Sequence, residues 1–532
     1  MTSRAPYGVV LNERSRREFE LLNSLCAVEN YGHLLSYLEA QLRRAWLNKA
    51  FVVPPADVLI VIMTLAVLPD AELSGSEVKL DPCSVIKASI GSRSLKVLVQ
   101  FVEILLKKVP DTRIDYNLNL LRCQFFIVLD QLNSPGSQLL FSTRYRDSQK
   151  RRKTNSRISL EDTPNYSGTN AESSGFRNPY GSYVSVLEHK PRVLKNIVLT
   201  MLLAHGGEFW NSVIWTIYCS ISDDSHLYER SKRWTRLLSL IFDLFELRNE
   251  YCTKLGLDSN AQESPNYVSP LLNLFCSLNT SDTLTALCDI LLLGFDYSTA
   301  GAVSVHAVYD KEFTKPATYV TRTVEDRSLR FMESMAFRHR LLLSFTKLID
   351  SLPDHLQSTY QNLSNARFNK TLSRFLSRIE NLSQLKHFFC VANLSAFLGT
   401  MPHIAQATLN ECLVDLEQQR EVSLVDSLGG DDTMINELID LFGSGFPLLD
   451  RNDVQPRNTT YTLIEKCDIC LLVILRYWEY VHQSSRIKTR QSYQDLLESV
   501  HQNDQRRITF ARVMNWEEAQ LPLLSPQLNK ML

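Results

Sequence analysis

The chain has 532 residues, 44% of them hydrophobic and 22% charged, a composition that can bury the core of a soluble globular protein. Its 57 Lys and Arg balance 58 Asp and Glu, which excludes a global basic field able to hold nucleic acid or an anionic membrane. Any contact with DNA would have to be local or indirect.

Cysteine usage and the apolar runs both predict an intracellular protein. The eleven cysteines form an odd set, most of them inside apolar segments, as is typical of free thiols used as small core residues in a reducing compartment. The first residues lack the apolar core of a signal peptide, and the longest apolar run, Val58 to Leu68, is too short to span a membrane. We therefore expect no membrane partner.

Helical spacing dominates residues 1–141, the predicted N-terminal helical region. Leucines recur at threes and fours from Glu18 to Trp46, and a break at Asn30 to Gly32 predicts a helical hairpin. Prolines bound a buried helix over 56–68, and further helices are predicted over 95–108 and 116–132.

Composition changes at residues 142–177, which are rich in Ser, Asn, Arg and Lys and poor in aliphatic side chains. Such a segment cannot bury much surface, so we predict a disordered insertion. A run of four positive charges within it suits nuclear import or an ordinary solvated loop. Beside that run, apolar residues followed by acids could add a strand to the sheet edge of a ubiquitin-like modifier such as SUMO. The candidate import residues are Lys150, Arg151, Arg152 and Lys153, and the candidate SUMO contacts are Ile158, Leu160, Glu161 and Asp162.

Helical patterns resume in the middle region, 178–296. Aromatic and arginine side chains near its start are candidates for a partner interface, although packing against the start of the next helix is the favoured role for them. These residues are Phe176, Arg177, Tyr180 and Tyr183. In residues 297–328, β-branched side chains alternate with polar ones, which predicts a small β-hairpin or an extended arm.

The C-terminal helical region, 329–532, is predicted to be organised around a central helix at 465–483. On a helix its charged residues form one stripe, which we expect to be the only edge that faces water. The stripe consists of Glu465, Asp468, Arg476 and Glu479. The opposite, core-facing side consists of Cys467, Cys470, Leu471, Ile474, Leu475 and Trp478. Two shorter helices are predicted after it, at 492–502 and 507–516.

These elements together predict an all-α fold, either an irregular multi-helix bundle or a degenerate α-solenoid. The sequence contains no phosphate-binding glycine loop, no nucleophile elbow and no H-E-x-x-H motif. Cys467 and Cys470 form a C-x-x-C pair, which could be redox-active or half of a zinc site. The nearest histidine, His482, lies about three turns along the same helix and out of reach of either sulfur, which favours two core cysteines.

Four blocks of sequence resemble the yeast-type fifth non-SMC element subunit of the Smc five-six complex, where SMC stands for structural maintenance of chromosomes. The blocks are Glu29–Leu42, Leu120–Leu132, Asn178–Glu188 and Ile464–Tyr477. The resemblance implies a nuclear, chromatin-associated, non-enzymatic helical subunit without a cofactor, which pairs with the sixth non-SMC element. It further implies that the pair loads the complex on chromatin in DNA repair, restrains its ATPase and supports SUMO ligation. Two rival functions stay open: a thiol or zinc enzyme that uses Cys467 and Cys470, and a direct DNA-binding protein.

Overall fold

The computed structural model describes sixteen stretches of the chain, and the helices account for most of them. The described residues are 9–48, 51–69, 89–107, 115–130, 202, 206–254, 270–278, 282–296, 304–308, 317–318, 328–352, 363–418, 421–429, 433–447, 456–482 and 491–531. The predicted all-α fold is confirmed. The chain divides into two compact units, the first comprising residues 1–219, 224–278 and 307–314 and the second the remainder.

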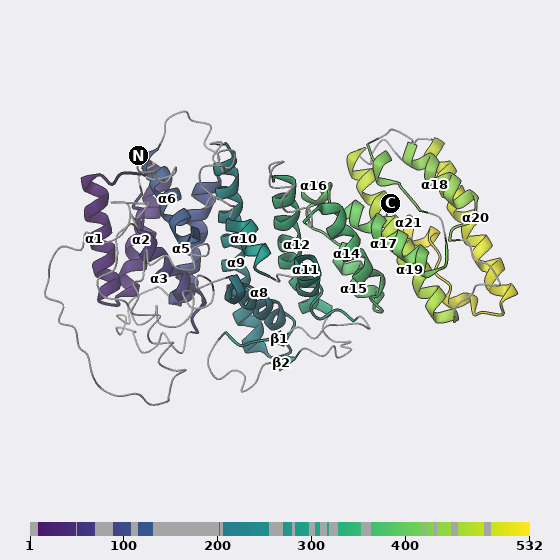
Figure 1. The fold of residues 1–532 in the computed structure, drawn as a ribbon, viewed down its shortest axis with the longest axis horizontal. Helices are drawn as coiled ribbons and strands as arrows, with labels where there is room; N and C mark the ends of the chain where they lie inside the picture. Colours follow the sequence, from purple (N-terminus) through teal and green to yellow (C-terminus); the bar gives the residue numbers. More distant parts are fainter. Residues whose placement is uncertain are drawn as a thin grey trace, which may run out of the picture. The chain divides into compact units, whose positions relative to one another are not determined.

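The first unit contains eight described helices (Figure 1). They are α1 (Glu13–Ala27), α2 (Tyr31–Asn48), α3 (Ala56–Val67), α5 (Ile90–Leu106), α6 (Tyr116–Asp130), α8 (Gly206–Ser220), α9 (Ser225–Lys254) and α10 (Pro270–Cys276).

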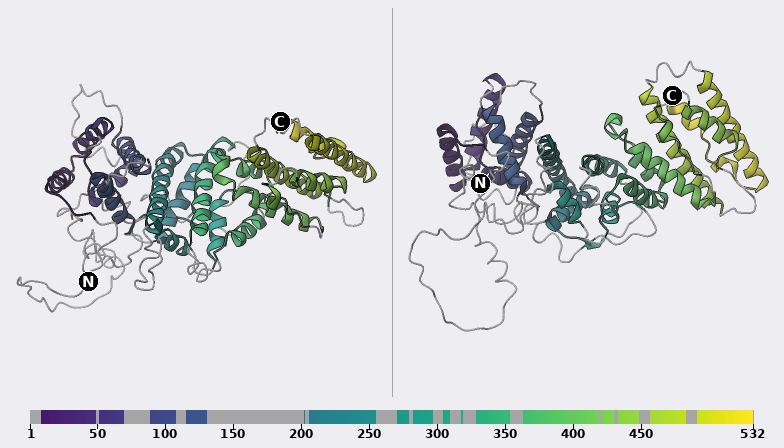
Figure 2. Two further views of the ribbon diagram at one scale, coloured as in Figure 1. Left: turned by 90° about the horizontal axis from the view of Figure 1, so that it is seen from above. Right: turned by 45° about the horizontal axis from the view of Figure 1, so that its top comes forward.

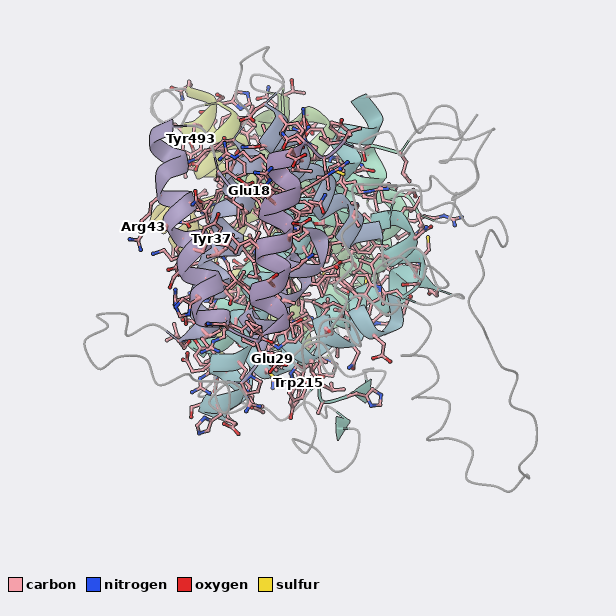
Figure 3. The ribbon with its side chains drawn as sticks, turned by 90° about the vertical axis from the view of Figure 1, so that its left-hand side faces the viewer. Glu18, Glu29, Tyr37, Arg43, Trp215 and Tyr493 are labelled. Carbon is pink, nitrogen blue, oxygen red and sulfur yellow. The ribbon has the colours of Figure 1, made fainter. Side chains whose placement is uncertain are left out.

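The predicted hairpin near the N-terminus is present as α1 and α2. The Asn12 side chain caps α1 by accepting a hydrogen bond from the Ser15 backbone N–H at 2.8 Å. The break falls slightly earlier than predicted, because Glu29 adopts a left-handed conformation with φ of 55° and Gly32 already belongs to α2. Figure 3 looks onto this hairpin, with Glu18 marking α1, Glu29 the turn between the helices, and Tyr37 and Arg43 marking α2.

Helix α3 is the centre of the first unit. All twelve of its residues are buried, as expected of a helix that is apolar on every side. It contacts α1, α5, α6 and α9. Helix α5 approaches the C-terminal end of α3 through Gly91, where a Cβ atom would lie 3.2 Å from the Leu65 carbonyl oxygen and 2.8 Å from an Arg233 guanidinium nitrogen. The missing side chain of Gly91 is what permits this close packing.

The second unit contains ten described α-helices, two short 3-10 helices and one small strand pair (Figure 1). The helices up to the middle of the unit are α11 (Thr283–Leu291), α12 (Ser328–Asp350), α14 (Asn365–Ser377), α15 (Leu382–Phe389), α16 (Leu394–Phe397) and α17 (Met401–Asp415). Those that follow are η5 (Val425–Ser427), α18 (Thr433–Gly443), α19 (Arg457–Val481), α20 (Gln491–Val513), η7 (Glu518–Gln520) and α21 (Ser525–Met531). Helices α17 and α19 lie side by side, and so do α18 and α20 (Figures 1 and 2).

The predicted hairpin within 297–328 is present as a minimal antiparallel pair. Strands β1 (Ser304–Val305) and β2 (Ala317–Thr318) pair Ser304 with Thr318 and Val305 with Ala317.

Helix α12 is tied to its neighbours by two buried polar side chains. The Arg338 guanidinium donates to the carbonyl oxygens of Leu291 and Leu293 at 2.6 and 2.7 Å, and so satisfies the C-terminal end of α11. The His339 imidazole lies 2.6 Å from the Phe388 carbonyl oxygen, at the end of α15. These contacts attach α12 to the C-terminal ends of α11 and α15.

Helix α20 corrects the predicted pair of shorter helices. It is one helix of 23 residues that runs through the polar stretch 503–506 without a break. Polar residues predicted a turn here because they are usually solvated. Instead Asn503 and Asp504 are buried and bond to other segments, while Gln505 and Arg506 are exposed, so one side of the polar stretch belongs to the interior of the second unit.

Candidate functional site

Helix α19, which carries the predicted central segment, packs against α15 and α17. It begins at Arg457, eight residues before the predicted start, after Pro456, whose fixed φ suits a helix entry. All six residues predicted to face the core are buried, none more than 1% exposed. The helix is therefore enclosed along most of its length.

The two cysteines of the C-x-x-C pair lie next to a third thiol, that of Cys412 on α17. A hydrogen bond with Cys412 and full burial raise the pKa of the Cys467 thiol well above its usual range. Burial, followed by the nearby Cys412 sulfur, does the same to the pKa of Cys470. A redox or nucleophilic cysteine works as a partly exposed thiolate, and both features are disfavoured here. The three thiols fill space between α17 and α19.

Lys466 is a buried cation that sequence analysis missed. Burial lowers the pKa of its ammonium group. Its Nζ donates to the carbonyl oxygen of Ser377, the last residue of α14, and the nearby Cys412 thiol and then the Asp415 carboxylate partly oppose the lowering of its pKa. Lys466 thus connects α14, α17 and α19 through one side chain.

Asp468 corrects the predicted solvent-facing stripe, because it is fully buried. Both of its carboxylate oxygens accept from the Arg507 guanidinium of α20, each at 2.8 Å. Burial raises the pKa of the Asp468 carboxyl, and the Arg507 charge counteracts that rise. The geometry is the bidentate arrangement that an arginine fork makes with a carboxylate.

Two more residues of α20 extend this pair into a buried polar cluster, defined here as Asp468, Asn503, Asp504 and Arg507. The Asn503 amide accepts from the Phe446 N–H at 2.7 Å and donates to the Phe446 carbonyl at 2.6 Å. The Arg507 Nη2 also donates to that carbonyl, at 3.0 Å. Each polar group therefore has a partner, as burial requires.

Asp504 extends the buried polar cluster to α21. Its carboxylate accepts from the N–H groups of Leu524 and Ser525 at 3.1 and 2.8 Å and from the Ser525 hydroxyl at 2.6 Å. These are N–H groups that the first turn of a helix leaves unpaired. The cluster therefore joins α19, α20, α21 and the segment after α18. Asn503 and Arg507 are four residues apart and so lie on one helix face. This spacing was the sequence signal from which the buried polar cluster could have been suspected.

The outer edge of α19 carries the side chains that are free to meet a partner. Arg476 is exposed, and Tyr480 and Val481 are 45% and 36% exposed. Upstream, Glu465 is engaged by Lys386 of α15 at 2.8 Å. Arginine and tyrosine are the residue types that most often anchor protein interfaces. The last two turns of α19 are therefore the candidate contact surface of this helix.

Other predicted sites lie outside the described residues. These are the basic run Lys150–Lys153, the Ile158–Asp162 segment and the aromatic group Phe176, Arg177, Tyr180 and Tyr183. Within the described part of the chain, no cluster of three or more His, Cys, Asp or Glu could hold a metal ion. Among the described helices, none combines the length and apolar character needed to cross a bilayer.

Comparison with known proteins identifies the family. A family model described as DNA repair proteins Nse5 and Nse6 matches residues 2–500, which include every described helix from α1 to α19 and the start of α20. The non-structural maintenance of chromosome element 5 of Saccharomyces cerevisiae is 30% identical over 537 residues, covering 99% of this chain and 95% of the yeast protein. The chain therefore belongs to the Nse5 family of DNA repair proteins.

Proposed function

We propose that this chain is a non-catalytic subunit of the Smc five-six complex that pairs with a second helical subunit, the sixth non-SMC element. The observation that carries the proposal is the family match over residues 2–500, because the family description names Nse5 and Nse6 together. The buried, protonated state of Cys467 and Cys470 argues against the rival thiol enzyme.

The pair would act on the ATPase through binding alone. A bound protein slows turnover only if it binds a non-hydrolysing arrangement of the ATPase more tightly than the active one. The same contact would deliver the complex to chromatin in the nucleus, where DNA could displace the pair and release the restraint. Support of SUMO ligation would follow from holding the associated ligase close to its substrates. DNA contact by this chain itself would be indirect, in keeping with its formal net charge of -1.

The test is reconstitution of the Smc five-six complex with and without the pair. We expect the pair to lower the ATP hydrolysis rate in the absence of DNA and DNA to relieve part of the effect. An unaltered rate in both conditions, or a lone chain that hydrolyses a substrate itself, would contradict the proposal. Stoichiometric zinc in the purified chain would favour the metal enzyme, and steep salt dependence of DNA binding would favour the direct DNA-binding protein.

The outer edge of α19 can be tested within the same experiment. The double substitution Arg476→Ala, Tyr480→Ala should weaken pairing at least about tenfold if this edge contacts the partner, since such anchors often contribute more than 1 kcal/mol each. Arg43→Ala, at an exposed position of α2, is the matched control and should leave pairing unchanged. Equal affinity of the two variants would remove this edge from the interface.

A further inference from the structure

Ser525 is held by its side chain as well as by its backbone at the start of α21. Its hydroxyl donates to the Asp504 carboxylate at 2.6 Å, and its N–H donates to the same oxygen at 2.8 Å. The next residue is Pro526, which is exposed. A serine followed directly by proline is the minimal substrate of proline-directed protein kinases.

The hydrogen-bond partner of Ser525 is itself an anion, so its surroundings are electrostatically unfavourable for a second one. Asp504 is buried, and the nearest guanidinium nitrogen, Arg507 Nη1, lies 3.9 Å from its carboxylate. That guanidinium is already used by both oxygens of Asp468 and by the Phe446 carbonyl. A phosphate on Ser525 would carry a charge of about −1.5 to −2 beside the Asp504 carboxylate, and among the described residues the guanidinium next to that carboxylate is already engaged.

We propose that Ser525 is a phosphorylation site and that its phosphate releases α21 from α20. A proline-directed serine/threonine kinase would transfer the γ-phosphoryl group of ATP to the Ser525 Oγ. The new bond joins that oxygen to phosphorus, the bond from phosphorus to the ADP oxygen breaks, and the hydroxyl proton passes to the kinase's base. The half-buried Ser525 becomes available when the short helix α21 opens locally, and the phosphate then prevents it from closing.

Phosphate at a helix N-terminus usually stabilises the helix, because it accepts from the free N–H groups of the first turn. Here the Asp504 carboxylate already accepts from the N–H groups of Leu524 and Ser525. The phosphate would compete for those donors and repel the carboxylate, so its effect on docking has the opposite sign.

Release of α21 would uncover apolar surface of the second unit. Leu521, Leu524 and Leu528 are buried in the docked segment. Leu521 packs in a cluster with Tyr461 and Ile464 of α19 and Ala511 of α20, with Leu523 packed against it. A modification at Ser525 would therefore change which apolar side chains the second unit presents to a partner. This inference stands independently of the ATPase proposal.

The experiment treats the full chain with a proline-directed kinase and ATP, locates the phosphate by mass spectrometry and measures amide exchange over 521–531. Phosphorylation should speed exchange there at least about tenfold, because loss of the three hydrogen bonds to Asp504 is worth more than a tenfold change in the opening constant. Ser525→Ala removes the phosphate acceptor but keeps both backbone bonds to Asp504. It should show no phosphate at residue 525 and no acceleration after the same treatment.

A second variant keeps the test informative if α21 of the wild-type chain opens too rarely for the kinase to reach Ser525. Leu528→Ala removes a buried anchor of α21 and should raise the rate of Ser525 phosphorylation severalfold. Absence of phosphate on Ser525 in both the wild-type chain and Leu528→Ala would overturn the proposal. Unchanged exchange in the phosphorylated chain would overturn it equally.

Discussion

At the scale of single residues, the pair Asp468 and Arg507 shows how burial increases the energetic effect of removing one charged side chain. The two side chains are 0% and 2% exposed, and both Asp468 oxygens accept from Arg507, which also donates to the Phe446 carbonyl. Removal of one member leaves the other as an uncompensated charge inside the second unit, which is far less favourable than replacement of both.

The first prediction follows from this difference. Arg507→Met should lower the free energy of unfolding by about 3 to 5 kcal/mol, whereas adding Asp468→Leu to it should restore part of that loss. Denaturant titration of the single and double variants measures both values. Arg512 lies on the same helix as Arg507, and Arg512→Met removes only its exposed pair with Glu518 of η7, so it should have a much smaller effect. Equal losses for Arg507→Met and Arg512→Met would contradict the role of burial.

His339 gives a pH-dependent prediction. Burial lowers the pKa of its imidazole from 6.5 to about 4, although the hydrogen bond to the Phe388 carbonyl partly opposes this. As the pH falls below about 6.5, His339 is protonated in the unfolded chain but stays neutral in the folded chain. The free energy of unfolding is therefore highest above this pH and decreases towards pH 4. The loss should reach roughly 3 kcal/mol.

Comparison with His339→Phe isolates this effect, because the phenyl ring has a similar shape and does not titrate. Urea titrations at several pH values should give a steeper decline between pH 6.5 and 4 for the wild-type chain than for the variant. Parallel declines would show that His339 is protonated equally in both states.

At the scale of elements, two glycines at the same helical position make a matched pair. Gly91 is the second residue of α5 and Gly32 the second residue of α2. A Cβ atom at Gly91 would press on the Leu65 carbonyl, which is backbone and cannot move aside easily, while nothing lies within 4 Å of one at Gly32.

Alanine should therefore have opposite effects at the two sites. Gly91→Ala should destabilise the first unit by about 1 to 3 kcal/mol through overpacking. Gly32→Ala should be neutral or stabilise by up to about 1 kcal/mol, because it restricts the unfolded chain without a clash. Thermal or denaturant unfolding distinguishes them, and stabilisation by both substitutions would refute the close packing of α3 against α5.

The sequence predicts the bounds of a helix well where the spacing of apolar residues alone determines that helix. Helix α3 was predicted almost residue for residue, because every side is apolar and proline precedes it. Helix α20 was divided in two and Asp468 was assigned to solvent, because their buried polar residues find partners 20 to 61 residues away in sequence. The spacing of Asn503 and Arg507 places them on one helix face, but their partners come from tertiary packing and cannot be found from local spacing.

At the scale of the whole molecule, the segment 142–177 is predicted from composition to contribute little to the core, and it lies outside the described residues. Deleting it should leave far-UV helicity and the cooperative melting transition nearly unchanged, since loop length affects stability only weakly. Loss of folding on deletion would contradict the predicted insertion.

Replacement of Lys150 to Lys153 by alanine tests nuclear import separately, and unchanged nuclear accumulation would rule out a necessary role.

The buried polar cluster also determines the order in which helices of the second unit can pack during synthesis. Asp468 leaves the ribosome 39 residues before Arg507, which at about 5 to 20 residues per second is a delay of about 2 to 8 s. Throughout that interval the Asp468 carboxylate has no guanidinium partner, so the side of α19 that bears it is more stable in contact with water. The apolar side of α19 can already pack on α15 and α17, whereas the Asp468 side can be buried only after α20 has emerged.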